Sequence, residues 1–445
     1  MAPASGGPLA VASRLSPAWL ADQRWFRAKR RPIAAVVGVD AFPLAEEAVW
    51  LLVLGVRFAD GGEERYLLPA VTGADGLREP EDGEGAWRAL AAGIVSASTI
   101  RGVAGGALRC ERGAGLSAIL GNEVADVVSL PERRMGVEQS NTSVVLGERL
   151  MLKLYRHAES GINPEVELSA FLTEVGFRQT PALAGWIHWD PLDGAPCAAA
   201  MLQERLPATG DGWAWALGCL ASPAGTEAAI VGVARIGEIT AHLHAALASR
   251  PEATGFEVRS AAEPDLAAWR ASAERQLRLA FAALDVPQRS QLESIAHRLR
   301  RRLDAIGRAG GVRVSRLHGD YHLGQLLRVG GDFSVVDFEG EPARPLAERR
   351  EPASPLRDLA GMLRSLDYAA RTAARDRGSS DGEAEAWLGR VRAAFLGAYG
   401  PLYAQERALL AAFEVEKACY EAHYEANNRP DWTWLPLEAL ARFAA

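Results

Sequence analysis

Long apolar runs are absent from this chain of 445 residues. No stretch approaches the ~20 consecutive apolar residues that a helix needs to cross a bilayer. The first twenty residues also lack the positively charged segment and apolar core of a secretory signal. We therefore expect a cytoplasmic protein with no membrane partner.

A surplus of positive charge is absent as well. The chain has 49 lysines and arginines against 56 aspartates and glutamates, and its formal net charge is −7. A general nucleic-acid binder needs a basic face that neutralises phosphates. The composition therefore argues against a nucleic-acid partner, although it leaves room for a local basic pocket that holds a nucleotide.

Cysteine is scarce: Cys110, Cys197, Cys219 and Cys419 are scattered and form no CxxC or Cys/His metal pattern. Isolated cysteines of this kind are typical of buried free thiols in a reducing compartment. The sequence therefore favours free thiols over disulfides.

The order of the predicted elements divides the chain. Apolar residues make up 49% of the sequence, which is typical of a globular protein. Up to residue 205 most apolar runs predict strands, with helices near 85–98 and 164–175. Beyond residue 206 helical periodicity dominates. This order predicts an α+β fold with a module over 1–105, a strand-rich lobe over 106–205 and a helical lobe over 206–445.

The helical half contains the segment "RLHGDYHLGQLLRVGGDFSVVDFEGEP", residues 316–342. A Gly-Gly pair between its two short apolar runs predicts a β-hairpin. Asp320 follows a glycine in a loop, where a carboxylate can orient a substrate hydroxyl or accept its proton. Gln325 and Asp337 offer an amide oxygen and a carboxylate, which suit Mg²⁺ beside nucleotide phosphates. The spacing matches the metal-assisted template of kinases.

Two other interpretations of this segment are weaker. A solvated polar turn would not require the full set of side chains at this spacing. His318 and His322 are four residues apart, as in some zinc sites, but no HExxH glutamate lies between them. The kinase interpretation is therefore favoured.

A kinase also needs a cation for the ATP phosphates in its strand-rich lobe. Lys153 alternates with Leu152 and Leu154 in "RLMLKLYR", so it should point away from the face that they share. An exposed lysine on an edge strand is the alternative.

The acid that orients Lys153 should lie on the next helix, which Asn163 is well suited to cap. We favour Glu167, because it is set between Val166 and Leu168 in the helix body. Glu165 is the second choice.

Neither a G-x-G-x-x-G sequence nor a P-loop precedes the strand of Lys153. The equivalent position is "GVEQSNTSVVLG", a loop rich in hydroxyl and amide groups. The groups that could hold phosphates belong to Ser140, Asn141, Thr142 and Ser143.

Six motifs together resemble actinobacterial maltokinases, which belong to the aminoglycoside-phosphotransferase branch of the protein-kinase-like fold. They span roughly residues 130–435, and "WLADQRWFRAKRRPI" more loosely resembles the start of the maltokinase cap module. The six motifs are "EQSNTSVVLGERLMLKLYR", "SGINPEVEL", "HGDYHLGQLL", "DFEGEPARPLAERR", "SPLRDLAGMLRS" and "YEAHYEANNRPDW".

The resemblance implies a bilobal ATP-dependent kinase with an N-terminal cap subdomain. Asp320 would be the catalytic aspartate, and Asp358 is expected to brace the loop that carries it. The remaining implied roles are Mg²⁺ binding by Gln325 and Asp337, phosphate binding by Lys153 and by a loop from Gln139 to Ser143, and adenine binding by the backbone around Glu204 and Leu206.

The acceptor pocket is expected to draw on Asp320 and on the C-terminal helix, where two tyrosines and two glutamates each recur at i, i+4. Aromatic faces and carboxylates both suit a sugar, although core tyrosines beside a solvated acidic stripe would give the same pattern. The predicted sugar contacts are Asp320, His322, Glu339, Tyr420, Glu421, Tyr424, Glu425, Asn428, Arg429, Asp431 and Trp434.

The chain departs from the maltokinase pattern at Asn427, which stands where an arginine is common. Losing this cation while Glu421, Glu425 and Asp431 remain should make the pocket more negative and favour a cationic sugar. We therefore predict a kinase that makes glucosamine 6-phosphate, and some maltokinase-like proteins are similar to glucosamine kinases.

Other functions stay open behind this one. The runner-up is a maltokinase that makes maltose 1-phosphate, and aminoglycosides are a third possible acceptor. A nucleotide-binding pseudokinase should have lost Asp320, Asp337 or Lys153, and all three are present. A protein kinase is disfavoured because no DFG and APE landmarks follow Asp337. We expect a monomer that uses ATP and Mg²⁺.

Overall fold

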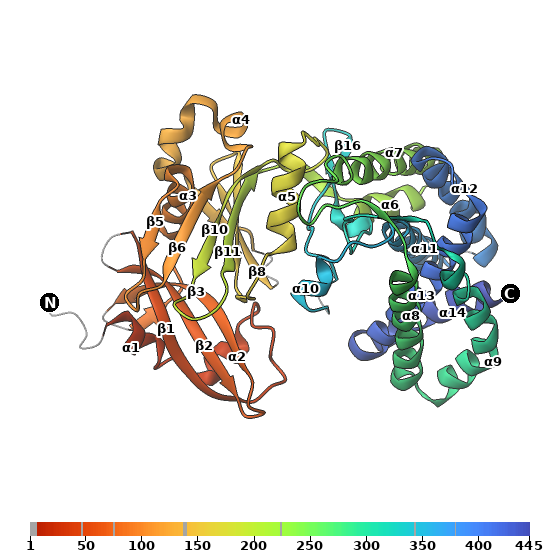
Figure 1. Cartoon of the computed structure of the whole chain (residues 1–445), viewed down its shortest axis with the longest axis horizontal. Helices are drawn as coiled ribbons and strands as arrows, with labels where there is room; N and C mark the ends of the chain where they lie inside the picture. Colours follow the sequence, from red (N-terminus) through yellow and green to blue (C-terminus); the bar gives the residue numbers. More distant parts are fainter. Residues whose placement is uncertain are drawn as a thin grey trace. The chain divides into compact units, whose positions relative to one another are not determined.

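The computed structural model describes residues 7–45, 48–73, 76–136, 140–222, 225–341, 344–378 and 380–445. The chain divides into two compact units, Met1–Leu206 and Pro207–Ala445. Strands dominate unit 1 and helices dominate unit 2, as Figure 1 shows for each unit. The α+β class predicted from the sequence is confirmed, while the boundary at residue 105 stays a prediction.

The first sheet of unit 1 is antiparallel, with the strand order β1-β2-β3-β4. Its central strand β2 is almost continuously apolar because both of its faces are buried. Leu51 and Val53 point into one core cluster, whereas Leu52 and Leu54 point into the other. The strands are β1 (Ile33–Ala45), β2 (Val49–Phe58), β3 (Glu63–Gly73) and β4 (Gly76–Arg78).

The second sheet of unit 1 has seven strands in the order β5-β6-β10-β11-β9-β8-β7. The strands are β5 (Thr99–Arg101), β6 (Ala107–Arg112), β7 (Glu132–Arg134), β8 (Asn141–Leu146), β9 (Leu150–Tyr155), β10 (Leu183–Asp190) and β11 (Cys197–Glu204). The helices of unit 1 are α1 (Pro8–Ala12), α2 (Pro17–Asp22), α3 (Ala86–Ser96), α4 (Leu116–Leu120) and α5 (Pro164–Glu174).

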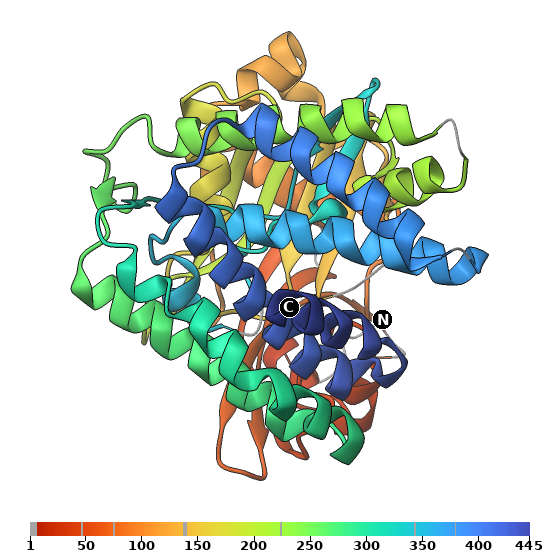
Figure 2. The same cartoon turned by 90° about the vertical axis from the view of Figure 1, so that its right-hand side faces the viewer.

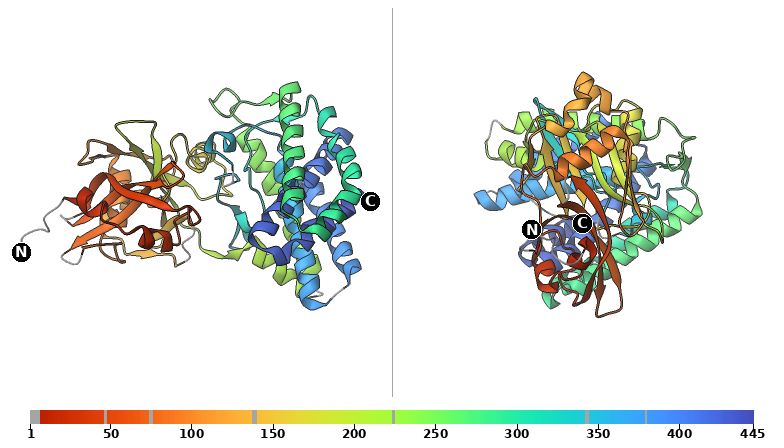
Figure 3. Two further views of the ribbon diagram at one scale, coloured as in Figure 1. Left: turned by 90° about the horizontal axis from the view of Figure 1, so that it is seen from below. Right: turned by 90° about the vertical axis from the view of Figure 1, so that its left-hand side faces the viewer.

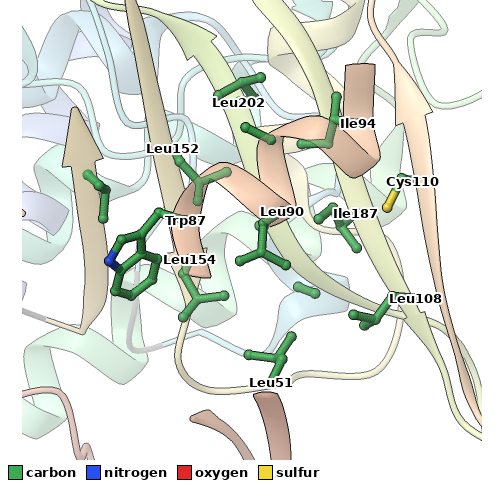
Figure 4. Close-up of a cluster of buried hydrophobic side chains, with 14 of the residues drawn as sticks. Leu51, Trp87, Leu90, Ile94, Leu108, Cys110, Leu152, Leu154, Ile187 and Leu202 are labelled. Carbon is green, nitrogen blue, oxygen red and sulfur yellow. The ribbon is translucent and has the colours of Figure 1, made fainter. Parts of the chain in front are cut away.

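Helix α3 fills the space between the two sheets. Trp87, Leu90 and Ile94 are fully buried and share one core cluster with Leu51 of the first sheet and Leu152 of the second. Figure 4 shows these side chains pointing toward one another from the helix and the strands. One face of the first sheet therefore shares a core with the second sheet around this helix, while its other face packs into a separate cluster that includes Trp25 and Phe26.

Long helices make up most of unit 2. Helix α7 packs against α12, α8 packs against α13, and α11 packs against both α12 and α13. Figures 2 and 3 show these helices, coloured green to blue, lying alongside one another. Their bounds, with those of the shorter helices, are α6 (Gly212–Leu220), α7 (Gly225–Leu247), α8 (Glu263–Ala283), α9 (Val286–Leu303), α10 (Leu346–Arg349), α11 (Leu356–Arg377), α12 (Asp381–Tyr399), α13 (Ala404–Asn428) and α14 (Trp434–Ala444).

The hairpin predicted from the Gly-Gly pair is present in unit 2. Strands β15 (Leu326–Val329) and β16 (Asp332–Val335) are antiparallel, and Val329 pairs with Asp332 across the turn. Gly330 and Gly331 have φ values of 56° and 89°, a left-handed pair that favours glycine. Strand β12 (Ala208–Asp211) adds to β15, and a separate two-stranded ladder joins β13 (Arg259–Ser260) to β14 (Arg313–Val314).

All four cysteines are buried and free, as the sequence predicted. Within the part of the chain that the structure describes, no helix combines the length and apolarity that a membrane span requires.

Gly361 on α11 lies against the loop that carries Asp320. A Cβ atom at this position would lie 2.5 Å from the backbone oxygen of Tyr321. Backbone cannot move aside cheaply, so we expect Gly361→Ala to lower the free energy of unfolding by about 1–3 kcal/mol. Urea unfolding followed by circular dichroism measures the change.

Gly389 on α12 is the matched control. A Cβ atom there meets nothing within 4 Å. Gly389→Ala should therefore raise the free energy of unfolding by roughly 0.5–1 kcal/mol, because alanine loses less backbone entropy than glycine in a helix. Equal effects of the two substitutions would show that the contact with Tyr321 does not matter.

Candidate active site

Lys153 lies on β9 and points away from the core, as its alternation with leucines predicted. Leu152 and Leu154 are fully buried in the core of unit 1. The Lys153 Nζ atom lies 2.9 Å from Glu165 Oε1 and 2.8 Å from Glu165 Oε2. Both side chains are largely buried, with 12% and 5% exposed. The lysine is therefore a buried, paired cation and not an exposed edge residue.

Helix α5 holds the carboxylate of Glu165 at its first turn. Asn163 caps this helix, and its side-chain oxygen accepts from the backbone N–H groups of Glu165 and Val166 at 2.8 and 3.2 Å. The Tyr155 hydroxyl donates to Glu165 Oε2 at 2.8 Å. The carboxylate is thus held by the helix start, by Tyr155 and by Lys153.

The preference for Glu167 over Glu165 is corrected by this geometry, because the carboxylate that meets Lys153 in these contacts belongs to Glu165. Two residues on a helix differ by about 200°, so the two glutamates face nearly opposite sides. Apolar neighbours in sequence do not mark a buried face of a helix, since each lies about 100° away. Glu165 is 3% exposed, which identifies the inward side.

The predicted phosphate loop is partly described. Gln139 lies outside the described residues, Ser140 is exposed, and Asn141 and Ser143 are half-buried. Thr142 is fully buried on β8, and its hydroxyl accepts from Arg156 Nε at 2.7 Å. The Thr142 hydroxyl is therefore occupied by the protein itself, because strand alternation turns it inward.

The predicted adenine contacts lie at the end of β11. The Glu204 N–H donates to the Ala182 oxygen at 2.9 Å, which leaves this donor engaged. Leu206 is the last residue of unit 1. The adenine role of Glu204 and Leu206 stays a prediction, and a purine hydrogen bond from this N–H would have to replace the existing one.

In unit 2, Asp358 braces the loop that carries Asp320. Its carboxylate oxygens accept from the backbone N–H groups of His318 at 2.8 Å and Gly319 at 3.0 Å. The His244 Nε2 atom lies 3.0 Å from the same carboxylate. Burial raises the pKa of Asp358, but the contacts with His244 and the loop outweigh it and the pKa is lowered. The expectation that Asp358 supports this loop agrees with these contacts.

The two histidines of the loop have separate surroundings. His318 is buried, and its Nε2 atom lies 2.9 Å from the Val336 oxygen. His322 Nδ1 accepts from the Gly324 N–H at 3.0 Å, and its Nε2 atom lies 3.9 Å from Asp320 Oδ2. Burial lowers the pKa of His322 more than the nearby carboxylates raise it. Each ring is thus positioned by the loop rather than by a shared zinc ion.

Gln325 and Asp337 meet across the hairpin. Gln325 Nε2 lies 3.0 Å from Asp337 Oδ2. The hairpin β15–β16 separates them in sequence and returns the chain to the same place. An amide and a carboxylate side by side, both half-buried, fit the oxygen ligands that Mg²⁺ prefers.

Asp337 also has an unusual backbone. Its φ of 67° lies in the left-handed region, which is uncommon for residues other than glycine. Such conformations cost about 1–3 kcal/mol and gather at functional sites, where the surrounding structure enforces them. Glu339 lies two residues further along and is half-buried.

Lys417 is a cation of this region that sequence reasoning missed. Lys417 on α13 places its Nζ atom 3.3 Å from Asp320 Oδ1 and 3.0 Å from Glu341 Oε1. Asp320, Glu341, Lys417 and Tyr420 line a pocket of about 530 Å³ within unit 2. The spacing Glu416-Lys417-x-x-Tyr420 does not identify Lys417 by itself. It would do so only if the contact between α13 and the Asp320 loop were already known.

The predicted aromatic ridge of α13 is partly in this pocket. Tyr420 lines the pocket, and the ring of Tyr424 is stacked near it with centroids 6.2 Å apart. Tyr424 is 43% exposed. Tyr420 is therefore the aromatic residue of this ridge that lies beside Asp320.

The acidic ridge of α13 is neutralised by arginines. Glu421 Oε2 accepts from Arg364 at 2.6 and 2.9 Å, and both Glu425 oxygens accept from Arg429 at 2.6 and 2.8 Å. Exposed Asn427 donates its side-chain amide to the backbone oxygen of His423 on the surface of α13. The charge argument from Asn427 is therefore weakened, because Glu421 and Glu425, two of the three acids that it counted, already have cationic partners.

The remaining predicted sugar contacts lie toward the end of α13 and beyond it. Asn428 and Asp431 are exposed, and the Asn428 side chain donates to the Tyr424 oxygen at 2.8 Å. The ring of Trp434 is covered by the guanidinium of Arg375 at 4.9 Å, while Arg429 stacks on Trp432 at 4.8 Å. None of these residues lines the pocket beside Asp320.

Comparison with protein families gives two matches along the chain. Residues 132–409 match the phosphotransferase enzyme family, and residues 19–89 match the maltokinase N-terminal cap domain. The chain belongs to the phosphotransferase enzyme family. The matched segment of this phosphotransferase includes Lys153, Glu165, Asp320 and Asp337.

Two relatives are glucosamine kinases. The chain is 31% identical over 436 residues to that of Streptacidiphilus jiangxiensis, which covers 92% of each chain. It is 29% identical over 320 residues to that of Mycolicibacterium smegmatis, which covers 69% of this chain and 78% of the relative. The resemblance to the maltokinase-like and glucosamine kinase group is thereby confirmed.

One solved structure shares the fold of this phosphotransferase. It is a glucosamine kinase in complex with glucosamine, ADP and inorganic phosphate, with a TM-score of 0.73 and 24% identity. The match covers 98% of this chain and 99% of that one. The predicted kinase-like fold of the aminoglycoside phosphotransferase type is confirmed.

The pairing of Lys153 with Glu165 gives a prediction for nucleotide use. Glu165→Gln removes the charge that holds Lys153, so we expect kcat/KM for ATP to fall about 10–100-fold. The matched control Glu167→Gln on the same helix should change it less than about threefold. Steady-state kinetics with varied ATP measure both. A greater loss in Glu167→Gln would restore the choice made from the sequence.

Proposed function

We propose that this phosphotransferase is a sugar kinase that transfers the γ-phosphate of ATP to a hydroxyl group of glucosamine, giving glucosamine 6-phosphate. The observation that carries the acceptor is the 31% identity to a glucosamine kinase over 92% of both chains. The complex of a structural neighbour with glucosamine and ADP supports both the acceptor and the nucleotide.

Asp320 is the proposed catalytic residue of the reaction. It lines the pocket of unit 2, and its loop is fixed by two backbone hydrogen bonds to Asp358. A carboxylate at this position orients the acceptor hydroxyl and accepts its proton as the oxygen bonds to the γ-phosphorus. The bond from that phosphorus to the β,γ-bridging oxygen breaks, and ADP leaves.

Mg²⁺ would be held by Gln325 and Asp337, whose side chains already lie 3.0 Å apart. When bound, Mg²⁺ neutralises charge on the phosphate oxygens. Lys153 is proposed to bind phosphate oxygens of ATP, and Glu165 holds its ammonium in place. These roles follow from the residues present and from the kinase template.

Maltose is the second candidate acceptor. The match of residues 19–89 to the maltokinase N-terminal cap domain favours it, and the pocket of about 530 Å³ is large. Glu421 and Glu425 are each paired with an arginine, which weakens the charge argument that favoured glucosamine over maltose. The preference for glucosamine therefore depends on the relatives.

A coupled assay of ADP release with Mg-ATP and a panel of free sugars tests the proposal. Glucosamine should turn over fastest, and Asp320→Asn should reduce kcat by about 10²–10⁴-fold because the base is lost. Removing Mg²⁺ with EDTA should abolish turnover. The phosphorylated hydroxyl is identified by ³¹P-coupled NMR of the product.

Asp332→Asn is the matched control. Asp332 lies on β16, is paired with Arg235 at 2.9 Å and does not line the pocket. It should keep full activity. Faster turnover of maltose would replace the proposed acceptor, and equal activity of Asp320→Asn and the wild type would remove Asp320 from the mechanism.

The acidic net charge and the sequence pattern also lead us to propose a cytoplasmic monomer without a nucleic-acid partner. Size-exclusion chromatography with light scattering measures the oligomeric state.

A further inference from the structure

Lys417 is the ammonium group that meets Asp320 most closely among the described ion pairs of unit 2. Its Nζ atom lies 3.3 Å from Asp320 Oδ1 and 3.0 Å from Glu341 Oε1. It also lies 4.7 Å from the centroid of the Tyr420 ring. Its side chain is 21% exposed, so this cation is held in a partly dry site between two carboxylates.

Glu341 fixes Lys417 from the other side. One Glu341 oxygen accepts from Lys417, and the other accepts from Arg344 Nε at 2.6 Å. Burial raises the pKa of Glu341, but Lys417 and Arg344 lower it to about 2. Burial lowers the pKa of Lys417, yet the carboxylates of Glu341 and Asp320 raise it above the ordinary value. Glu341 and Lys417 therefore stay charged at neutral pH.

The contact with Lys417 gives the two carboxylate oxygens of Asp320 different surroundings. Oδ1 is engaged by Lys417, while the closest ion-pair contact of Oδ2 is His322 Nε2 at 3.9 Å, beyond hydrogen-bond distance. Rotation of the carboxylate would break the contact with Lys417. Lys417 thus anchors one oxygen of the carboxylate.

We propose that Lys417 is a positioning residue for phosphoryl transfer: it fixes the orientation of the Asp320 carboxylate toward the acceptor hydroxyl, and Glu341 fixes Lys417 in turn. This inference rests on the proposed function, because it takes Asp320 as the group that orients the acceptor. Displacing a catalytic base by about 1 Å can lower the rate about 10²-fold, so loss of the contact with Lys417 should slow the reaction.

The charges of the cluster also bear on the acceptor. Asp320 and Glu341 are balanced by Lys417 and Arg344, so the four side chains together carry no net charge. These four side chains therefore add no net charge to the pocket that they line.

The first test is Lys417→Ala, with Lys417→Arg as the conservative variant. We expect kcat with glucosamine to fall about 100-fold in Lys417→Ala, with KM for ATP changed less than about threefold. Lys417→Arg should keep more activity. Propylammonium added to Lys417→Ala replaces the missing atoms and should restore kcat several-fold, which a purely structural role would not allow.

Two further variants separate positioning from stability. Glu341→Gln keeps Lys417 but loosens its anchor, so its kcat should lie between those of the wild type and Lys417→Ala. Arg392→Met on α12 is the matched control, because it leaves Glu414 of α13 without the partner that it binds at 2.6 and 3.0 Å. It should lower the free energy of unfolding without the loss of kcat.

The outcomes distinguish the two proposals. A wild type that releases ADP with glucosamine and a Lys417→Ala variant that is equally fast would overturn the inference alone. The same holds if Lys417→Ala loses no more activity than Arg392→Met, or if propylammonium restores nothing while Glu341→Gln is fully active. A wild type that phosphorylates no sugar would overturn the proposed function and this inference together.

Discussion

The carboxylate of Asp358 is the constraint on which the candidate site of unit 2 depends. It accepts from two successive backbone N–H groups, those of His318 and Gly319, and it contacts His244 on α7. A loop with unsatisfied backbone donors would not keep one conformation in a buried place. Because Asp358 sits on α11, the position of the Asp320 loop follows from the packing of the long helices. Asp320 lies in a loop, but the helix α11 fixes the position of that loop through Asp358.

The charged side chains of the candidate site in unit 1 are also held in place by packed secondary structure. Lys153 is fixed on a strand whose other face belongs to the core, and Glu165 is fixed at a capped helix start. Neither charge would be stable in this largely buried place alone, since an unpaired buried charge is costly. In each unit, the charged groups of the candidate site are therefore paired and positioned by residues of that same unit, without a nucleotide or a sugar.

Local patterns predicted the elements that local physics determines. Strand alternation placed Lys153, the Gly-Gly pair placed the hairpin, and Asn163 marked a helix start. Other features depend on chain segments that meet only after folding. Lys417 and Asp320 are 97 residues apart, and no periodicity connects them. The choice of Glu167 failed for a different reason, because a strand-like argument from flanking residues was applied to a helix.

At Asp337 the backbone conformation favours glycine, whereas the proposed reaction requires a carboxylate. Its φ of 67° is a conformation that glycine adopts at no steric cost. A glycine at this position would relax the chain and remove the carboxylate at once, so the more stable protein would be the one without its proposed metal ligand. Selection for thermal stability alone would therefore drive this position away from function, which is the stability–activity trade-off seen where strained residues carry chemistry.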